Sequence, residues 1–198
     1  MTAAPLVLQT PAEHPFAQFV RILGKGKRGA RGLTREEARE ALGLILDDKV
    51  EEAQLGAFLM LLRHKEESAE ELAGFTEAVR ERLRAPKIAV DLDWPSYAGK
   101  KRHLPWYLLA VKCLGGSGTR ILLHGAGAHT AGRLYTEQLL ELLGLPLCRD
   151  WSAVSQALDT QGVAFAPLVD WMPRLQQMID LRNTLGLRSP IHSSVRLI

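Results

Sequence analysis

Apolar residues recur at helical spacing between about residues 14 and 85. Two of these runs begin at capping boxes, in which a hydroxyl group and a glutamate satisfy free backbone N–H groups at the start of a helix: Thr34 with Glu37, and Ser68 with Glu71. The run over 55–62 is apolar on nearly every side and predicts a central helix. Pro86 ends the last run. Residues 14–85 are therefore predicted to form a small helical bundle, preceded by a tail at 1–13.

After Pro86 the pattern changes to short apolar runs that alternate with helical stretches. The predicted strands cover 88–92, 120–124 and 163–166, and the predicted helices cover 106–114, 130–143, 151–159 and 171–185. Such alternation is typical of parallel strands joined by crossover helices. The predicted fold class is thus α + α/β, with a small N-terminal helical bundle domain (14–85) followed by a partial, mostly parallel α/β domain (86–198). Three or four strands are few for such a sheet, so we expect a longer domain that is truncated here at its C-terminus.

The composition is that of an ordinary globular protein. Of the 198 residues, 46% are hydrophobic, which is enough for a substantial core. Two cysteines, Cys113 and Cys148, fit neither a disulfide framework nor a metal site and favour a reducing cytoplasm. Residues 1–10 have no basic start and are interrupted by proline, so neither a signal peptide nor a membrane span is predicted.

Positive charge is concentrated in two segments. Residues 21–39 carry seven basic and two acidic side chains, whereas 47–82 carry five basic and ten acidic ones. Within the first segment, GKGKRGARG (24–32) interleaves glycines with cations and predicts a mobile basic loop. The second basic segment, KKRH (100–103), lies between a predicted strand and the next helix, where backbone N–H groups and the helix dipole favour an anion. Charged segments are usually just solvated, but two basic loops also fit a polyanion such as nucleic acid.

Candidate site residues come from these segments and from the end of the second predicted strand. The predicted nucleic-acid contacts are Arg21, Lys25, Lys27, Arg28, Arg31, Lys100, Lys101 and Arg102. The candidate anion contacts are His124, His129 and Arg133, with Arg182 and Arg188 as further candidates, of which Arg188 is better explained as a surface residue. No carboxylate or cysteine accompanies the two histidines, so no metal site is predicted. Four aromatic residues could stack unpaired bases, although each taken alone is better explained as core: Trp94, Tyr97, Trp106 and Tyr107.

The sequence LTREEAREALGLILDDKVEEAQLGAFLMLLRHKEESAEELAGFTEAVRE (33–81) closely resembles the N-terminal helical domain of anthranilate phosphoribosyltransferase and its relatives, which include the pyrimidine-nucleoside phosphorylases. The resemblance continues through ILLHG (121–125), GVAFAPL (162–168) and LRNTLGLRSP (181–190). It implies a small helical domain, a larger α/β domain, a cleft between them and a homodimer formed through the helical domain. In the family the chain continues well beyond the position that matches Ile198.

The catalytic motifs of the family are altered in this sequence. The enzyme's glycine-rich GTGGD loop, which holds the pyrophosphate of phosphoribosyl pyrophosphate, is replaced by DWPSYAG (93–99), and its KHGNR motif by LHGAG (123–127). No catalytic residue and no cofactor is therefore assigned. These changes, together with the two basic loops, resemble the YbiB-like branch of the family, whose members lack the biosynthetic activity and bind nucleic acid with little sequence preference.

The resemblance implies a catalytically lapsed cytoplasmic homologue that binds single-stranded DNA or RNA with weak sequence preference. The contacts would be made to phosphates, by basic loops that line the interdomain cleft of a homodimer, with no membrane involved. One alternative is an active glycosyl- or phosphoribosyltransferase with an altered acceptor, in which Lys100, Lys101 and Arg102 hold the diphosphate and Mg²⁺ and phosphoribosyl pyrophosphate are required. A second alternative is a structural or regulatory dimer that binds neither kind of ligand.

Overall fold

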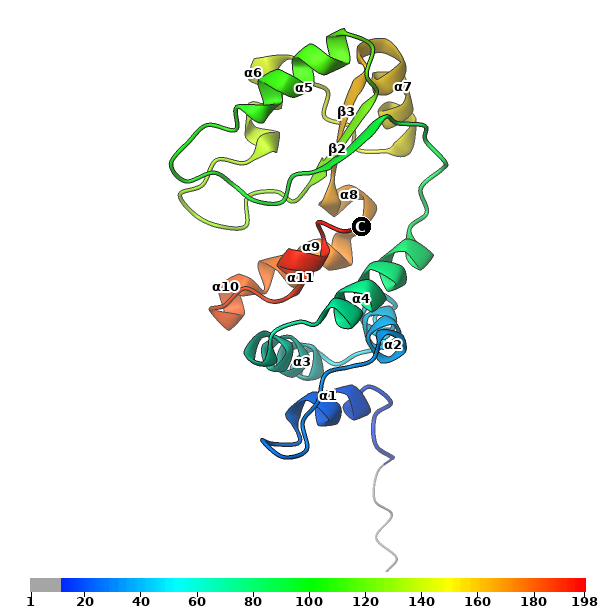
Figure 1. The fold of residues 1–198 in the computed structure, drawn as a ribbon, viewed down its shortest axis with the longest axis vertical. Coiled ribbons are helices and arrows are strands. Elements are labelled where there is room, and N and C mark those ends of the chain that lie inside the picture. Colours follow the sequence, from blue (N-terminus) through cyan, green and yellow to red (C-terminus); the bar gives the residue numbers. More distant parts are fainter. Residues whose placement is uncertain (1–11) are drawn as a thin grey trace, which may run out of the picture.

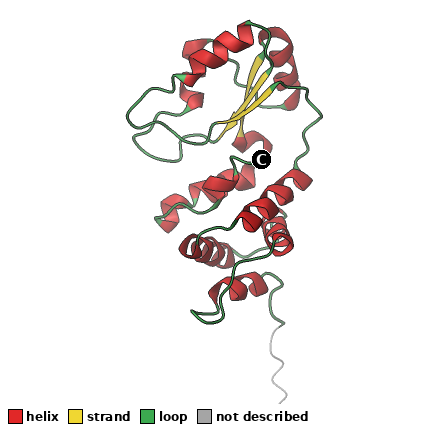
Figure 2. Ribbon diagram, in the orientation of Figure 1, coloured by secondary structure: helices red, strands yellow, loops and turns green. Residues whose placement is uncertain are grey.

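The computed structural model describes residues 12–198, so the predicted tail at 1–13 lies almost entirely outside the described residues. A helical unit lies below a small α/β unit in the view of Figure 1, and Figure 2 distinguishes the helices from the strands. The elements are, in chain order, α1 (Ala17–Gly24), α2 (Arg35–Leu46), α3 (Glu52–Lys65), α4 (Ala69–Arg82), β1 (Leu92–Pro95), α5 (Tyr107–Gly116), β2 (Ile121–Gly125), the 3-10 helix η1 (Thr136–Leu139), α6 (Leu140–Leu143), α7 (Trp151–Gln161), β3 (Val163–Pro167), α8 (Leu168–Trp171), α9 (Pro173–Asp180), α10 (Arg182–Leu185) and α11 (Ile191–Ser194).

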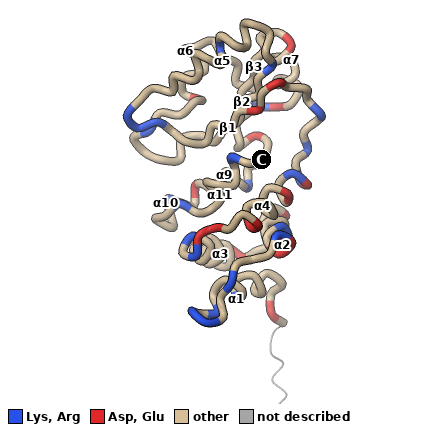
Figure 3. Tube along the Cα trace, in the orientation of Figure 1, with Lys and Arg blue, Asp and Glu red and all other residues tan. Residues whose placement is uncertain are grey.

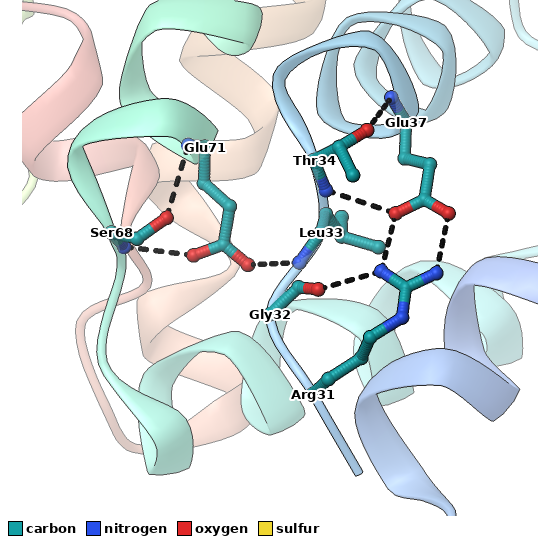
Figure 4. Close-up of polar contacts among 7 residues, drawn as sticks. All are labelled: Arg31, Gly32, Leu33, Thr34, Glu37, Ser68 and Glu71. Carbon is teal, nitrogen blue, oxygen red and sulfur yellow. Dashed lines mark hydrogen bonds and ion pairs between the residues drawn. The ribbon is translucent and has the colours of Figure 1, made fainter.

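Both predicted capping boxes are confirmed, and the second one extends into the core. The Ser68 hydroxyl accepts a hydrogen bond from the Glu71 backbone N–H, and the Glu71 carboxylate accepts one from the Ser68 N–H (2.8 Å). The same carboxylate also accepts a bond from the Leu33 N–H (2.9 Å; Figure 4). It accepts another from the Lys65 ammonium (2.8 Å), and Glu71 is fully buried. Glu71 thereby ties the start of α4 to the segment that enters α2.

Burial and hydrogen bonding act on Glu71 in opposite directions. Burial alone would raise the pKa of this carboxyl, but the bonds from Lys65, Ser68 and Leu33 outweigh it and hold the pKa below its ordinary value. The group is therefore a charged acceptor whose partners are all supplied by the fold.

Helices α2 and α4 pack closely because glycine lies where they meet. A Cβ atom added at Gly74 would lie 2.2 Å from the backbone oxygen of Arg35 and 2.9 Å from the Cβ atom of Ala38. Any larger residue at this position has to push the two helices apart.

Replacing Gly74 with alanine is therefore expected to lower the free energy of unfolding by about 1–3 kcal/mol through overpacking. Urea unfolding measures this change. Gly116→Ala, at the end of α5, is the matched control: no atom lies within 4 Å of the added Cβ, so stability should change by less than about 0.5 kcal/mol. A Gly74→Ala protein as stable as the original would contradict the close packing.

The α/β unit is built on a parallel three-stranded sheet in the order β1-β2-β3. Successive residues of the buried strands face opposite sides of the sheet. One side packs under α5 and α6 through Ile121, Leu123, Val163 and Phe165, and the other packs under α7 through Ala164 and Ala166. The predicted parallel strands with crossover helices are confirmed, and the helices cover both faces of the sheet. The carboxyl ends of the strands point toward α8 and the helical unit (Figure 1).

The chain returns to the helical unit after β3. Leu175 and Met178 of α9 and Ile191 of α11 belong to the same core as Phe58 of α3. The predicted boundary at residue 86 therefore does not separate the two cores. Residues 172–195 follow the sheet in the sequence but help to complete the core of the helical unit. An apolar helix face indicates that a helix is packed, but it does not identify the partner.

Three predicted elements differ from the structure. The helix predicted over 171–185 is divided among the end of α8, α9 and α10, with interruptions at Met172 and Leu181. Strand β1 begins at Leu92 rather than at residue 88, and residues 126–135 form a loop rather than part of a helix over 130–143. Gly132 has a φ of 69°, which is incompatible with a right-handed helix and favours glycine.

Candidate anion-binding site

Two loops at the carboxyl ends of β1 and β2 are fastened to each other. The Lys100 N–H donates to the Leu134 carbonyl (2.8 Å), and the Leu134 N–H donates to the Lys100 carbonyl (2.9 Å). The Arg133 guanidinium donates to the Gly99 carbonyl (3.1 Å). Gly99 permits this contact, because a Cβ atom there would lie 2.5 Å from the Tyr135 ring. The loops after β1 and β2 therefore form one joined surface.

This joined surface contains an open groove of about 390 Å³. Its lining residues are Lys100, Lys101, Arg102, His103, Leu104, Gly132, Arg133 and Leu134. The groove thus has four permanently cationic side chains and no carboxylate, and no ion pair involves these four within residues 12–198. Such a concentration of one sign of charge attracts an anion. The sequence placed Arg133 apart from Lys100, Lys101 and Arg102, and the structure brings the four together.

The second basic loop, between α1 and α2, lies at the other end of the molecule. Figure 3 shows it next to α1, with α3, α9 and α11 between it and the loops after β1 and β2. The prediction that both basic loops line one interdomain cleft is therefore wrong. The reason is that α9 and α11, which the sequence did not assign to the helical unit, fill the space between the sheet and α3.

The five cations predicted around this second loop are not equivalent. Arg21 pairs with Glu13, and Arg31 makes two bonds of 2.6 Å to the Glu37 carboxylate. The hydrogen bond from Arg31 is the main reason that the pKa of Glu37 falls to about 2. The other three side chains are exposed and make no ion pair in the part of the chain that the structure describes: Lys25, Lys27 and Arg28. These three remain the available cations of this loop.

His124 lies inside the protein. Its Nδ1 atom is 2.7 Å from the Tyr97 hydroxyl, and its Nε2 atom is 3.2 Å from an oxygen of Asp93. Burial, and to a lesser extent Asp93, raises the pKa of Tyr97, so the phenol stays protonated while it is hydrogen-bonded to Nδ1. The Nε2 side of the ring faces the Asp93 carboxylate. An anion could contact this ring only by displacing one of these partners.

His129 is also buried, and the Thr130 hydroxyl links it to Arg182. Its Nε2 atom lies 3.0 Å from the Tyr97 carbonyl, and its Nδ1 atom 3.2 Å from the Thr130 hydroxyl, which also accepts a bond from Arg182 (2.8 Å). Burial lowers the pKa of His129. Arg188 lies near Arg182, and burial followed by repulsion from neighbouring arginines lowers the pKa of Arg188.

His192 is a buried residue that the sequence did not single out. Its ring centre lies 5.3 Å from that of His129, its Nδ1 atom lies 3.1 Å from the Ser189 carbonyl, and its Nε2 atom has no partner in residues 12–198. Burial, followed by the nearby His129, lowers the pKa of His192 to about 4. No spacing pattern marks this residue, because its burial depends on α11 packing against the loop after β2.

The structure also sorts the four aromatic residues that were candidates for base stacking. Trp94 and Tyr107 pack on each other, with ring centres 5.3 Å apart, and both belong to the core under α5. Tyr97 is buried against His124. Trp106 differs, because 64% of its surface is exposed.

The described residues hold neither a metal-binding cluster nor a membrane-spanning helix. Residues 12–198 contain no group of three histidine, cysteine or acidic side chains placed to hold a metal ion. None of their helices is long and apolar enough to cross a membrane.

Comparisons with known proteins match both units of the chain. Residues 19–83 match the family model described as glycosyl transferase family, helical bundle domain. The chain is 27% identical to YbiB of Escherichia coli (strain K12), a protein described as uncharacterized, over 92% of this chain and 58% of that protein. It is 30% identical to anthranilate phosphoribosyltransferase of Bacillus caldotenax, over 85% of this chain and 69% of that protein. It is 33% identical to the Methylobacterium nodulans enzyme over 86% of this chain but 51% of the enzyme. The chain thus spans about half the length of most of these curated relatives.

Solved structures agree on the fold. Anthranilate phosphoribosyltransferase from Thermus thermophilus superposes with a TM-score of 0.71 at 23% identity, over 90% of this chain and 54% of that chain. The Saccharomyces cerevisiae enzyme in complex with PRPP and Mg gives a TM-score of 0.68 at 16% identity, over 94% of this chain and 55% of that one.

Proposed function

Because this chain belongs to the anthranilate phosphoribosyltransferase family of glycosyl transferases, and yet has DWPSYAG (93–99) in place of the enzyme's glycine-rich phosphate loop, followed directly by three cations at 100–102, we propose that it is a nucleic-acid-binding member of the family that lacks the transferase reaction. The groove formed by Lys100, Lys101, Arg102 and Arg133 binds backbone phosphates with little sequence preference. The observation that carries this proposal is the presence of four cations and no carboxylate in one open groove.

The loop after β1 is poorly suited to a diphosphate held by backbone N–H groups. Pro95 has no N–H, and the Ser96 N–H already donates to the His124 carbonyl (2.7 Å). Tyr97 is buried, with its hydroxyl bonded to His124. Two of the backbone positions that a phosphate cradle would use, Pro95 and Ser96, therefore offer no free N–H, which favours anion binding by the side chains that follow.

Phosphate binding by lysine and arginine side chains has a characteristic dependence on salt. Each neutralised phosphate releases counterions, so log affinity falls linearly with log salt, by about 0.7–0.9 per phosphate. Base edges are not read in this mode, and affinity is similar for unrelated sequences. Lys25, Lys27 and Arg28 form a separate, second phosphate contact at the far end of the helical unit. A cytoplasmic homodimer formed through that unit, also part of this proposal, would carry two copies of each contact.

Replacing Lys100, Lys101 and Arg102 together with alanine is expected to weaken binding to two unrelated oligonucleotides to the same extent. The slope of log affinity against log salt should fall by about 2–3, because three phosphate contacts are lost. Fluorescence anisotropy at several salt concentrations measures both quantities. The control removes the same charge from three exposed cations outside the groove, Lys49, Arg84 and Lys87.

Unchanged affinity in the groove variant, or an equal loss in the control, would contradict the proposed surface. If the original protein bound no oligonucleotide at low salt, the nucleic-acid function would be wrong. A rise in melting temperature with phosphoribosyl pyrophosphate and Mg²⁺ would then favour the alternative of a transferase with an altered acceptor, since a ligand of the native state must stabilise it.

A further inference from the structure

An exposed apolar patch borders the cationic groove. It consists of Leu104, Trp106 and Leu109, with 51%, 64% and 46% of their surfaces exposed. Leu104 itself lines the groove. The Trp106 N–H donates to the Leu104 carbonyl (2.9 Å), and the Leu109 N–H donates to the Trp106 carbonyl (3.0 Å). This turn holds the tryptophan beside the groove at the start of α5.

The other tryptophans of the chain have internal partners. Trp94 packs on Tyr107, and Trp151 lies 6.5 Å from Trp171 between ring centres. Trp106 makes no aromatic contact within the described part of the chain. A tryptophan side chain has a large apolar surface that folding normally buries. An exposed one beside two exposed leucines therefore marks a candidate interaction surface.

The groove and the patch together determine which class of ligand can bind. It must present negative charge to four cations and, directly beside them, a flat apolar group to Trp106. Unpaired nucleotides have both, because the phosphate is anionic and the free base has two apolar faces. In a duplex the bases are stacked on each other, so their faces are not available to a side chain at the surface.

We propose that Trp106, supported by Leu104 and Leu109, is a stacking platform for an unpaired base of a strand whose phosphates lie in the groove, so that this surface selects single-stranded nucleic acid over duplex. This inference rests on the proposed function and adds the residue that discriminates between strands. An anionic lipid surface is the competing ligand with both charge and apolar groups. Vesicle binding distinguishes the two ligands.

The decisive measurement compares one oligonucleotide, single-stranded and as a duplex, on the original protein, Trp106→Ala, Trp106→Phe and the control Leu142→Ala, whose side chain is 81% exposed on α6. Trp106→Ala should weaken single-strand binding roughly 5- to 150-fold, the equivalent of one stacked base. Duplex binding and the salt slope should not change, because no phosphate contact is removed. Trp106→Phe should retain most of the affinity, and Leu142→Ala all of it.

Tryptophan fluorescence gives a second readout. A single-stranded oligonucleotide should quench the emission of the original protein, and most of this quenching should be absent in Trp106→Ala. If Trp106→Ala binds single strands as well as the original protein does, or weakens single strand and duplex equally, the inference is wrong. It is also wrong if vesicles of phosphatidylserine and phosphatidylcholine shift the Trp106 emission and oligonucleotides do not.

The two proposals fail in different ways. If the triple alanine variant at Lys100, Lys101 and Arg102 lost affinity while Trp106→Ala did not, the stacking inference would fall and the nucleic-acid function would stand. If the original protein bound neither single strand nor duplex, both would fall.

Discussion

Replacing Glu71 with alanine is expected to lower the free energy of unfolding by about 3 kcal/mol. The carboxylate is fully buried and accepts hydrogen bonds from Leu33, Ser68 and Lys65. Its removal leaves the Leu33 and Ser68 N–H groups without their acceptor, and an unsatisfied buried donor costs about 1–3 kcal/mol. Lys65 is a quarter exposed and can turn toward water, which keeps the loss near the lower end of the range for breaking a buried ion pair.

Urea unfolding of three variants tests this expectation. Glu70→Ala removes an exposed glutamate from the preceding position of the same helix and should change stability by less than about 0.5 kcal/mol. Glu71→Gln keeps the size of the side chain and one acceptor oxygen but loses the charge, so it should fall between the other two. Equal stabilities for Glu70→Ala and Glu71→Ala would show that the network around Glu71 does not hold α4 to the segment before α2.

The same residue shows what sequence reasoning could and could not predict. The capping box at Ser68 and Glu71 was predicted, because its hydrogen bonds lie within four residues of each other. The bond from Leu33 joins positions 38 residues apart in the chain, so it depends on how α2 packs against α4. Local contacts leave a pattern in the sequence, and contacts of this kind do not.

The candidate site follows the same rule. The family fold and the cations at 100–102 were evident from the sequence, because both are continuous stretches. The pairing of Lys100 with Leu134, which brings Arg133 into the groove, was not. The separation of the two basic loops was also missed, because it depends on α9 and α11 lying between the sheet and α3. Charge counting finds cations, and only the tertiary fold decides which of them share a ligand.

Acidification between pH 6.5 and pH 4 is expected to destabilise the protein by up to about 3 kcal/mol through His192 alone. The pKa of His192 is about 4 in the folded protein, mainly because of burial and then because of His129, whereas an unfolded histidine has a pKa near 6.5. Above pH 6.5 the ring is neutral in both states, and the stability is fully present. As the pH falls, the unfolded chain takes up a proton that the folded protein does not, so stability is lost until the folded ring also titrates.

His192→Asn isolates this effect, because the amide N–H can replace the Nδ1–H group that donates to the Ser189 carbonyl and cannot titrate. Urea unfolding at intervals from pH 7 to pH 4 should show a shallower loss of stability for His192→Asn than for the original protein. The difference between their free energies of unfolding should change by up to about 3 kcal/mol over this range. Burial also lowers the pKa of His129, so His129 too makes the protein less stable as the pH falls. The folded pKa of Glu71 is lowered, and this carboxyl contributes to the pH dependence mainly below pH 4.5. Both remain in His192→Asn, so the difference between the two curves belongs to His192. Parallel curves would mean that the ring reaches water in the folded protein and that α11 does not close over the loop after β2.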